Sequence, residues 1–167
     1  VPLSTIAAGL AAARPVAGRL VTHRLPSGAH LIDDSYNANP GSLAAGIDTL
    51  AETCRATGET AWLVLGDMRE LGADAAALHG EAGRRARSAG VARLFALGEL
   101  SAHAVDAFGT GGAHFDSHDA LAQALRAALA AAGGGVRVLV KGSRGSAMDR
   151  IVTALLAAEG KGDDHAA

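Results

Sequence analysis

Two spacings of apolar residues alternate along this chain, and they predict alternating strands and helices. A continuous short apolar run is typical of a parallel strand buried on both faces, and one occurs at 61–65. Two further strands are expected at 93–97 and 136–140. A further short strand is expected at 113–115. Apolar residues spaced three and four positions apart predict helices. These helices are expected at 3–14, from 40 to about 58, at 74–89, near 100–108, at 119–132 and at 148–156.

Two turn signals organise the first part of the pattern. Pro26-Ser27-Gly28 separates the segments 19–25 and 29–34, and a proline and a glycine suit a tight turn between two strands. Asn39 followed by Pro40 has the residue types of a helix N-cap and first helical position. The whole pattern predicts an α/β fold, with a Rossmann-like open, mostly parallel sheet, helices on both faces and an initial, possibly antiparallel hairpin.

Composition and charge narrow the classes of function. The formal net charge is −2, with one Trp, one Tyr and three Phe, so the chain lacks the basic and aromatic residues typical of a nucleic-acid partner. Cys54 is the only cysteine, which excludes an internal disulfide, and its place on an apolar helix face predicts a core residue. No apolar stretch approaches the ~18 residues of a membrane span, so we expect no membrane segment and a cytoplasmic protein.

Three polar loops follow predicted strands, at 34–40, 66–72 and 141–145. Ligands of open α/β sheets bind outside the carboxyl ends of the strands, so the three loops predict one site. The chain has neither G-x-G-x-x-G nor G-x-x-x-x-G-K-[ST], which disfavours a dehydrogenase or a self-sufficient kinase. The loops instead offer carboxylates and amides for a ribose or an amine, and Lys141 with Arg144 for a carboxylate or phosphate.

Structural roles compete with binding roles at several of these positions. Asp33 and Asp34 could end a strand in an Asx-type turn, and the Tyr36 ring could pack rather than stack on a ligand. Lys141 and Arg144 could be a solvated pair near a helix N-terminus, although a bound anion explains cations there better.

Other residues of the loops have structural interpretations. For His79 we favour a structural role, as a surface residue or as a cap on a neighbouring loop. Met68 and Leu71 are expected to anchor their loop against the sheet, and Gly66 and Gly72 to give its ends backbone freedom. The spacing of histidines and Cys54 fits no zinc site, so we expect no metal ligands.

Three motifs, taken together in this order, resemble the Mur ligase family. They are DDSYNANP at 33–40, LGDM-x-ELG at 65–72 followed by His79 and Gly83, and VKGSR at 140–144 followed by Met148. Pro15-Val16-x-Gly18-Arg19 also matches the family's approach to its carboxyl-terminal domain, so the resemblance covers roughly 3–156.

The resemblance implies the carboxyl-terminal domain of the branch that adds D-Ala-D-Ala to UDP-MurNAc-tripeptide in peptidoglycan precursor synthesis. In that branch ATP converts the tripeptide carboxylate to an acyl phosphate, which the dipeptide amine attacks. The P-loop and the Mg²⁺ ligands belong to a central domain that is absent here, so the chain alone is not expected to be catalytic. The implied cofactors are ATP and Mg²⁺, and the implied partners are D-Ala-D-Ala, ATP and, through the missing domains, UDP-MurNAc-tripeptide. The implied organisation is a linker or short helix over 1–16, the domain over 17–159 and a disordered tail over 160–167.

The same resemblance assigns site residues in two groups, with no certain catalytic residue and no metal ligand in this domain. The ATP side comprises Asp34, Tyr36, Asn37 and Asn39. The D-Ala-D-Ala side comprises Asp67, Met68, Arg69, Glu70, Lys141, Ser143 and Arg144.

Two other functions remain open at this level. One is a free-standing nucleotide- or peptide-binding module with this fold. The other is the corresponding domain of another amide ligase of the superfamily, such as a folylpolyglutamate-like enzyme. A P-loop encoded upstream would favour a ligase over the free-standing module.

Overall fold

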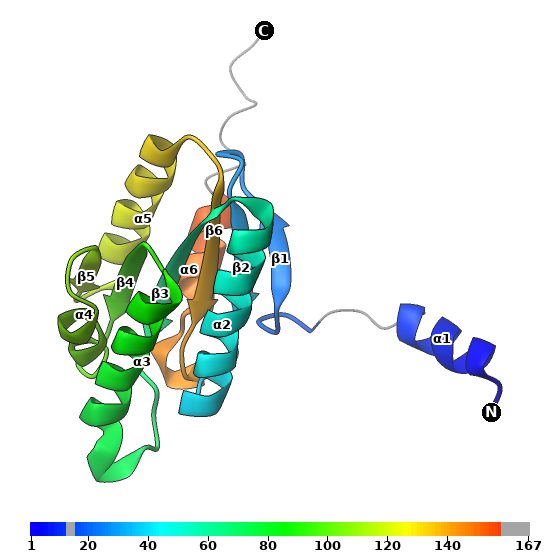
Figure 1. The fold of residues 1–167 in the computed structure, drawn as a ribbon, viewed down its shortest axis with the longest axis horizontal. Coiled ribbons are helices and arrows are strands. Elements are labelled where there is room, and N and C mark those ends of the chain that lie inside the picture. Colours follow the sequence, from blue (N-terminus) through cyan, green and yellow to red (C-terminus); the bar gives the residue numbers. More distant parts are fainter. Residues whose placement is uncertain (13–15, 158–167) are drawn as a thin grey trace, which may run out of the picture.

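A six-stranded sheet forms the centre of the molecule (Figure 1). The computed structural model describes residues 1–12 and 16–157. The strand order is β1-β2-β6-β3-β4-β5, in which only β1 runs antiparallel to its neighbour. The strands are β1 (Val21–Arg24), β2 (His30–Asp34), β3 (Thr60–Gly66), β4 (Arg93–Leu97), β5 (Gly112–Phe115) and β6 (Val136–Lys141). The predicted fold class, including the antiparallel first hairpin, is confirmed.

Helices cover both faces of the sheet. These helices are α2 (Pro40–Thr57), α3 (Ala75–Ala89), α4 (Ala102–Phe108), α5 (His118–Ala132) and α6 (Asp149–Ala157). Helix α1 (Leu3–Ala12) lies apart from the sheet (Figure 1). Two short 3₁₀ turns, Gly72–Asp74 and Arg144–Ser146, precede α3 and α6. Side chains of β3 alternate between the two faces, so Leu63 and Leu65 pack with α2, α3 and α4, whereas Trp62 and Val64 pack with α5 and α6. The two apolar layers therefore share one sheet.

The long helix α2 begins and ends where the sequence indicated. The Asn39 side chain accepts a hydrogen bond from the Ser42 amide, and the Asn39 amide donates to the Ser42 hydroxyl in return. Pro40 occupies the first turn of the helix. Gly58 ends the helix with a left-handed φ of 73°. Cys54 is buried on the apolar face of this helix, as predicted.

The first predicted helix, at 3–14, is present over its described part. Helix α1 spans Leu3–Ala12, residues 13–15 lie outside the described part of the chain, and residues 1–7 are all exposed. The predicted division into segments 1–16, 17–159 and 160–167 stays a prediction, and the predicted tail lies outside the described residues.

A cluster of charged side chains joins three elements at the amino edge of the sheet. Glu59 accepts hydrogen bonds from Arg137 Nε and Nη2 at 2.9 and 2.7 Å, and from the Thr57 hydroxyl at 2.7 Å. His30 Nδ1 lies 2.6 Å from the other carboxylate oxygen. Burial alone would raise the pKa of Glu59, but the bonds from Thr57, His30 and Arg137 outweigh it and lower the pKa to about 2. This cluster lies at the opposite end of the strands from the polar loops.

Candidate functional site

Parallel pairing brings the ends of β2, β6 and β3 to one edge of the sheet. Lys141 pairs in register with Asp34 on one side and with Leu65 on the other. The loops at 34–40, 66–72 and 141–145 therefore meet at one edge, as the alternating pattern predicted. Their contact is direct, because the Ser143 amide donates to the Asp67 carbonyl at 3.0 Å.

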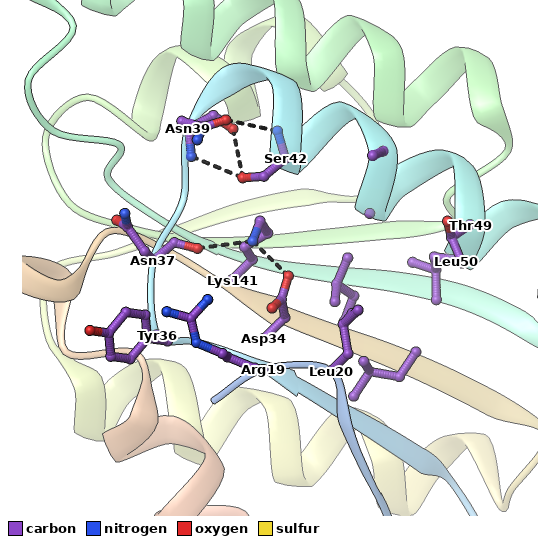
Figure 2. Close-up of a pocket in the computed structure, with 14 residues that line it drawn as sticks. Arg19, Leu20, Asp34, Tyr36, Asn37, Asn39, Ser42, Thr49, Leu50 and Lys141 are labelled. Atoms are coloured by element: carbon purple, nitrogen blue, oxygen red, sulfur yellow. Dashed lines mark hydrogen bonds and ion pairs between the residues drawn. The ribbon is translucent and has the colours of Figure 1, made fainter. Parts of the chain in front are cut away.

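A cavity of about 460 Å³ opens beside the first loop, between it and α2 (Figure 2). All four residues predicted for the ATP side line it, together with Lys141. Its other lining residues are Arg19, Leu20, Ile32, Ser42, Ala45, Gly46, Thr49, Leu50 and Leu139. One end of the cavity is thus polar and the other apolar, which suits a ligand with a sugar or phosphate on one side and a flat apolar group on the other.

Lys141 is a buried cation held by the first loop. Its side chain is 3% exposed, and its Nζ lies 2.6 Å from Asp34 Oδ2 and 2.9 Å from the Asn37 carbonyl oxygen (Figure 2). The interpretation of Lys141 as a solvated surface cation is therefore wrong, because strand pairing places its stem inside the sheet. The ammonium instead holds Asp34 and the turn at Asn37, and it lines the same cavity as the four residues predicted for the ATP side.

Tyr36 stands at the rim, with two guanidinium groups against its ring. The Cζ atoms of Arg19 and Arg144 lie 4.2 and 5.2 Å from the ring centroid, and the tyrosine is 40% exposed. Figure 2 shows Arg19 beside the ring. Tyr36 and Arg144 also line a second cavity, of about 920 Å³, between β1 and α6. The aromatic ring with its two cations thus separates the two cavities.

Arg19 is a site residue that the sequence assignment did not include. Val21 pairs with Asp33 in the antiparallel hairpin, and the Tyr36 amide donates to the Gly18 carbonyl at 3.0 Å. Continuing that register places Arg19 beside the polar loop. Counting residues outward from the predicted Pro26-Ser27-Gly28 turn would have found it.

Asp33 has the structural role considered for it. One carboxylate oxygen accepts from the Ser35 amide and hydroxyl at 3.1 and 2.5 Å, and the other accepts from the Gly18 amide at 3.1 Å. The side chain is buried. It closes an Asx-type turn and ties the hairpin to the first loop.

The second loop is held from several directions. Asp67 accepts from the Ser101 amide and hydroxyl at 2.8 and 2.5 Å, so its carboxylate faces the start of α4. Met68 is fully buried, which confirms that it anchors the loop. The Met68 amide donates to His79 Nε2 at 2.9 Å, so His79 caps a neighbouring loop, one of the two structural roles considered for it.

Ser143 connects the second loop to the first. Its hydroxyl donates to the Ala38 carbonyl at 3.2 Å and accepts from the Arg69 amide at 2.8 Å. The residue is buried. Met68 and Ser143 therefore lie beneath the surface of the site.

Three of the residues predicted for the dipeptide side are exposed, namely Arg69, Glu70 and Arg144. Arg69 extends over Gly145, where a Cβ atom would come within 2.8 Å of the arginine Nε. Glu70 has a left-handed φ of 63°, which is uncommon for a residue other than glycine and concentrates at functional sites. The exposed residues predicted for the dipeptide side therefore present two cations, Arg69 and Arg144, and one carboxylate, Glu70.

The two glycines of the second loop have different roles. Gly72 has a φ of 63°, so it supplies the backbone freedom expected of it. Gly66 has an ordinary φ, but a Cβ there would lie 2.7 Å from Met148 and Ser146. The expectation of backbone freedom at Gly66 is wrong. The glycine is needed because Ser146 and Met148, in the segment just before α6, pack directly on the end of β3.

Within residues 1–12 and 16–157, no group of three or more His, Cys, Asp or Glu side chains is arranged to hold a metal ion. Over the same residues, no helix combines the length and apolarity of a membrane span.

Comparison with known proteins decides the family. A sequence profile described as "Mur ligase, glutamate ligase domain" matches residues 18–144. The chain belongs to the Mur ligase family. The matched segment contains all three polar loops except the last residue of the third.

Two relatives of this chain are each named UDP-N-acetylmuramoyl-tripeptide–D-alanyl-D-alanine ligase. The protein of Escherichia coli strain K12 is 42% identical over 153 residues, covering 92% of this chain and 32% of the relative. That of Mycobacterium tuberculosis strain CDC 1551 / Oshkosh is 38% identical over 174 residues, covering 91% and 34%. The chain thus spans about a third of the length of these Mur ligases and matches their carboxyl-terminal domain.

Solved Mur ligases have the same fold. A crystal structure of MurF from Acinetobacter baumannii superposes with a TM-score of 0.82 at 27% identity, over 94% of this chain and 34% of that one. MurF from Thermotoga maritima, solved in complex with ADP, superposes with a TM-score of 0.72 at 21% identity, over 92% and 35%. At the latter identity the likeness concerns the fold alone.

Proposed function

We propose that this chain is the carboxyl-terminal domain of an ATP-dependent ligase that adds D-Ala-D-Ala to UDP-MurNAc-tripeptide in the cytoplasm. The observation that carries the proposal is the 42% identity over 153 residues to the E. coli ligase of that name, which includes the motifs that meet at one edge of the sheet. In the proposed reaction the tripeptide carboxylate takes the γ-phosphoryl group of ATP. The dipeptide amine then displaces phosphate from the acyl phosphate to form the amide.

The ATP half of the site is the 460 Å³ cavity at Asp34, Tyr36, Asn37 and Asn39. The carboxylate of Asp34, at the end of β2, and the side-chain amide of Asn39, at the N-cap of α2, suit the hydroxyls of a ribose. The exposed ring of Tyr36 offers a stacking surface for the adenine. The Arg19 guanidinium at the rim suits a phosphate. Mg²⁺ would be held with the ATP phosphates by residues of the absent central domain.

The dipeptide half comprises Asp67, Met68, Arg69, Glu70, Lys141, Ser143 and Arg144. The exposed side chains can contact the dipeptide directly: Arg69 and Arg144 suit its carboxylate, and Glu70 suits its ammonium group before attack. Asp67 and Met68 support this surface from beneath. Lys141 acts at a distance from it, by holding Asp34 and the first loop. Orienting the amine in this way is a proximity effect, which requires the other domains to close over the site and exclude water.

A domain exchange tests the proposal. This chain replaces the matched third of the E. coli ligase, and ADP release is measured with the UDP-MurNAc-tripeptide, ATP and D-Ala-D-Ala. We expect ligation that depends on D-Ala-D-Ala and is not supported by L-Ala-L-Ala. A chimera carrying Glu59→Gln, at the far edge of the sheet, is the matched control and should retain ligation.

The second candidate is a ligase that adds a single amino acid, such as glutamate. The description of the matching profile, "glutamate ligase domain", favours it. A folded chimera that forms the acyl phosphate but transfers glutamate and not D-Ala-D-Ala would establish this candidate and contradict the proposal.

A further inference from the structure

Two consecutive backbone amides in the second loop are each held by a buried side chain from a different element. The Met68 amide donates to His79 Nε2 on α3, at 2.9 Å. The Arg69 amide donates to Ser143 Oγ, in the loop after β6, at 2.8 Å. Both acceptors are buried, His79 completely. An N–H group turned into the protein needs such a partner, so these two side chains fix the direction of the loop at Met68 and Arg69.

The hydrogen bonds also fix the protonation of His79. Its Nδ1 lies 2.7 Å from the Ala75 carbonyl oxygen, which can only accept, so Nδ1 carries the proton. Its Nε2 faces an N–H donor and must be the unprotonated acceptor. The imidazole is therefore neutral, in a single tautomer, with both nitrogens occupied.

The Ser143 hydroxyl is similarly committed. Its one proton is directed to the Ala38 carbonyl oxygen, and one lone pair receives the Arg69 amide. A buried hydroxyl with these partners has no proton left to donate to a substrate carboxylate. The direct contact between Ser143 and the dipeptide expected from the sequence is thus replaced by an indirect role.

The exposed side chains of the second loop stand next to these two amides. Arg69 and Glu70 are exposed, and Glu70 has the left-handed φ of 63°. Such a conformation persists only where the surrounding structure determines it. The bonds at Met68 and Arg69 are the nearest constraints on it.

We propose that His79 and Ser143 are positioning residues for the acceptor dipeptide, a role that rests on the proposed function. They do not touch the dipeptide. They hold the Met68 and Arg69 amides so that the Arg69 and Glu70 side chains stand in the orientation that binds it.

The test uses backbone NMR of this chain and two matched pairs of variants. In His79→Gln the side-chain oxygen can reach the position of Nε2 and accept from Met68. In His79→Asn the shorter amide can reach only the position of Nδ1. Ser143→Thr keeps the hydroxyl, and Ser143→Ala removes it. Ser146→Ala is the control, because the Ser146 hydroxyl donates to the Asp67 carbonyl at 2.7 Å and touches neither amide.

Three quantities are measured on each variant. These are the hydrogen-exchange rates of the Met68 and Arg69 amides without ligand, the affinity for D-Ala-D-Ala, and the affinity for MgATP. The ¹⁵N shifts of the wild-type imidazole report the His79 tautomer. Leu129→Ala, in the core at the far end of α5, shows what a loss of stability alone does to the two affinities.

We expect a protonated Nδ1 in the wild type. His79→Asn should speed exchange at Met68, and Ser143→Ala at Arg69, by tenfold or more. Each should weaken D-Ala-D-Ala binding at least tenfold, while His79→Asn leaves MgATP affinity within twofold. His79→Gln, Ser143→Thr, Ser146→Ala and Leu129→Ala should each bind the dipeptide within about threefold of wild type.

Other outcomes overturn the proposal. If Ser143→Ala weakens dipeptide binding while the Arg69 amide exchanges at the wild-type rate, Ser143 is a direct ligand. If His79→Asn and Ser143→Ala bind the dipeptide as wild type does, neither residue positions it. A folded chimera with the E. coli ligase that binds MgATP but no D-Ala-D-Ala counts against the proposed function, and the exchange rates in this chain then decide separately whether the two side chains hold the loop.

Discussion

Lys141 shows how one buried charge can shape a ligand site. Its ammonium group reaches from β6 to Asp34 at the end of β2 and to the Asn37 carbonyl in the next turn. A buried ion pair contributes little net stability relative to apolar residues, but removing one partner is costly because the other remains uncompensated. The pair therefore has its largest effect on which conformation the first loop adopts.

Replacing Lys141 should destabilise the domain. Lys141→Met leaves the Asp34 carboxylate without its cation and the Asn37 carbonyl without a donor, so we expect a loss of about 2 to 3 kcal/mol in the free energy of unfolding. Urea unfolding measures it. The double variant Asp34→Asn, Lys141→Met removes both charges and should recover part of the loss. A single variant within about 0.5 kcal/mol of wild type would show that the pair is solvated after all.

Gly66 is the position where one added methyl group should matter most. In Gly66→Ala the new Cβ would lie 2.7 Å from Met148 and Ser146, so the segment just before α6 has to move away from the end of β3. Overpacking of this kind costs about 1 to 3 kcal/mol. Met148→Ala makes room, so the same glycine substitution should cost less in that background. Equal costs in the two backgrounds, measured by urea unfolding, would contradict this account.

Asn39 has both a capping and a proposed binding role in α2, and substitutions can separate them. Asn39→Ala removes the acceptor for the Ser42 amide and should cost about 1 kcal/mol. Asn39→Ser keeps a capping oxygen but shortens the side chain that lines the ATP cavity. We expect Asn39→Ser to restore most of the stability, measured by thermal unfolding, and to bind MgATP more weakly than wild type in an NMR titration. Full MgATP affinity in Asn39→Ser would mean that the residue is a cap only.

The Glu59 cluster predicts how the pairing of β2, β3 and β6 depends on pH. The pKa of Glu59 is about 2 in the folded chain, below its ordinary value of 4.5. Folding thus favours the ionised form of Glu59. Its contribution to the free energy of unfolding is complete above pH 4.5 and is lost as the pH falls from 4.5 towards 2. We expect ionised Glu59 to contribute about 1 to 3 kcal/mol to the free energy of unfolding at neutral pH.

Glu59→Gln tests this dependence. The variant should be less stable than wild type at pH 7, and the two free energies of unfolding should converge as the pH approaches 2. Urea unfolding at a series of pH values measures the difference. A difference that stays constant from pH 7 to pH 2.5 would show that Glu59 titrates normally in the folded chain.

The molecule as a whole should unfold in one step, because its two apolar layers lie on opposite faces of the same strands. Losing one layer exposes the sheet that the other needs, so neither is expected to persist alone. Fluorescence of Trp62, the only tryptophan, reports on β3, and far-UV circular dichroism reports on the helices. We expect coincident thermal transitions by the two probes. Separate midpoints would show that the layers unfold independently.

Sequence by itself determined the fold class and the edge of the sheet at which the three polar loops meet. Helix and strand periodicities are local, and so are the Asn39 cap, the Pro26-Ser27-Gly28 turn and the short apolar strands, which is why these elements were predictable. The position of three polar loops after three strands was also sufficient to predict that they meet. The motifs were sufficient for a resemblance to the Mur ligase family.

Only the tertiary structure decided what each side chain of those motifs does. Lys141 and Asp34 are 107 positions apart, and Ser143 and Arg69 are 74 apart, so their hydrogen bonds leave no local signal in the sequence. A motif shows that a residue type stands at a position, but not whether its polar atoms are already satisfied by distant partners. Strand pairing and packing set those partners. They divide the site into exposed residues such as Arg69 and buried residues such as Ser143, whose only hydroxyl proton is already directed to the Ala38 carbonyl oxygen.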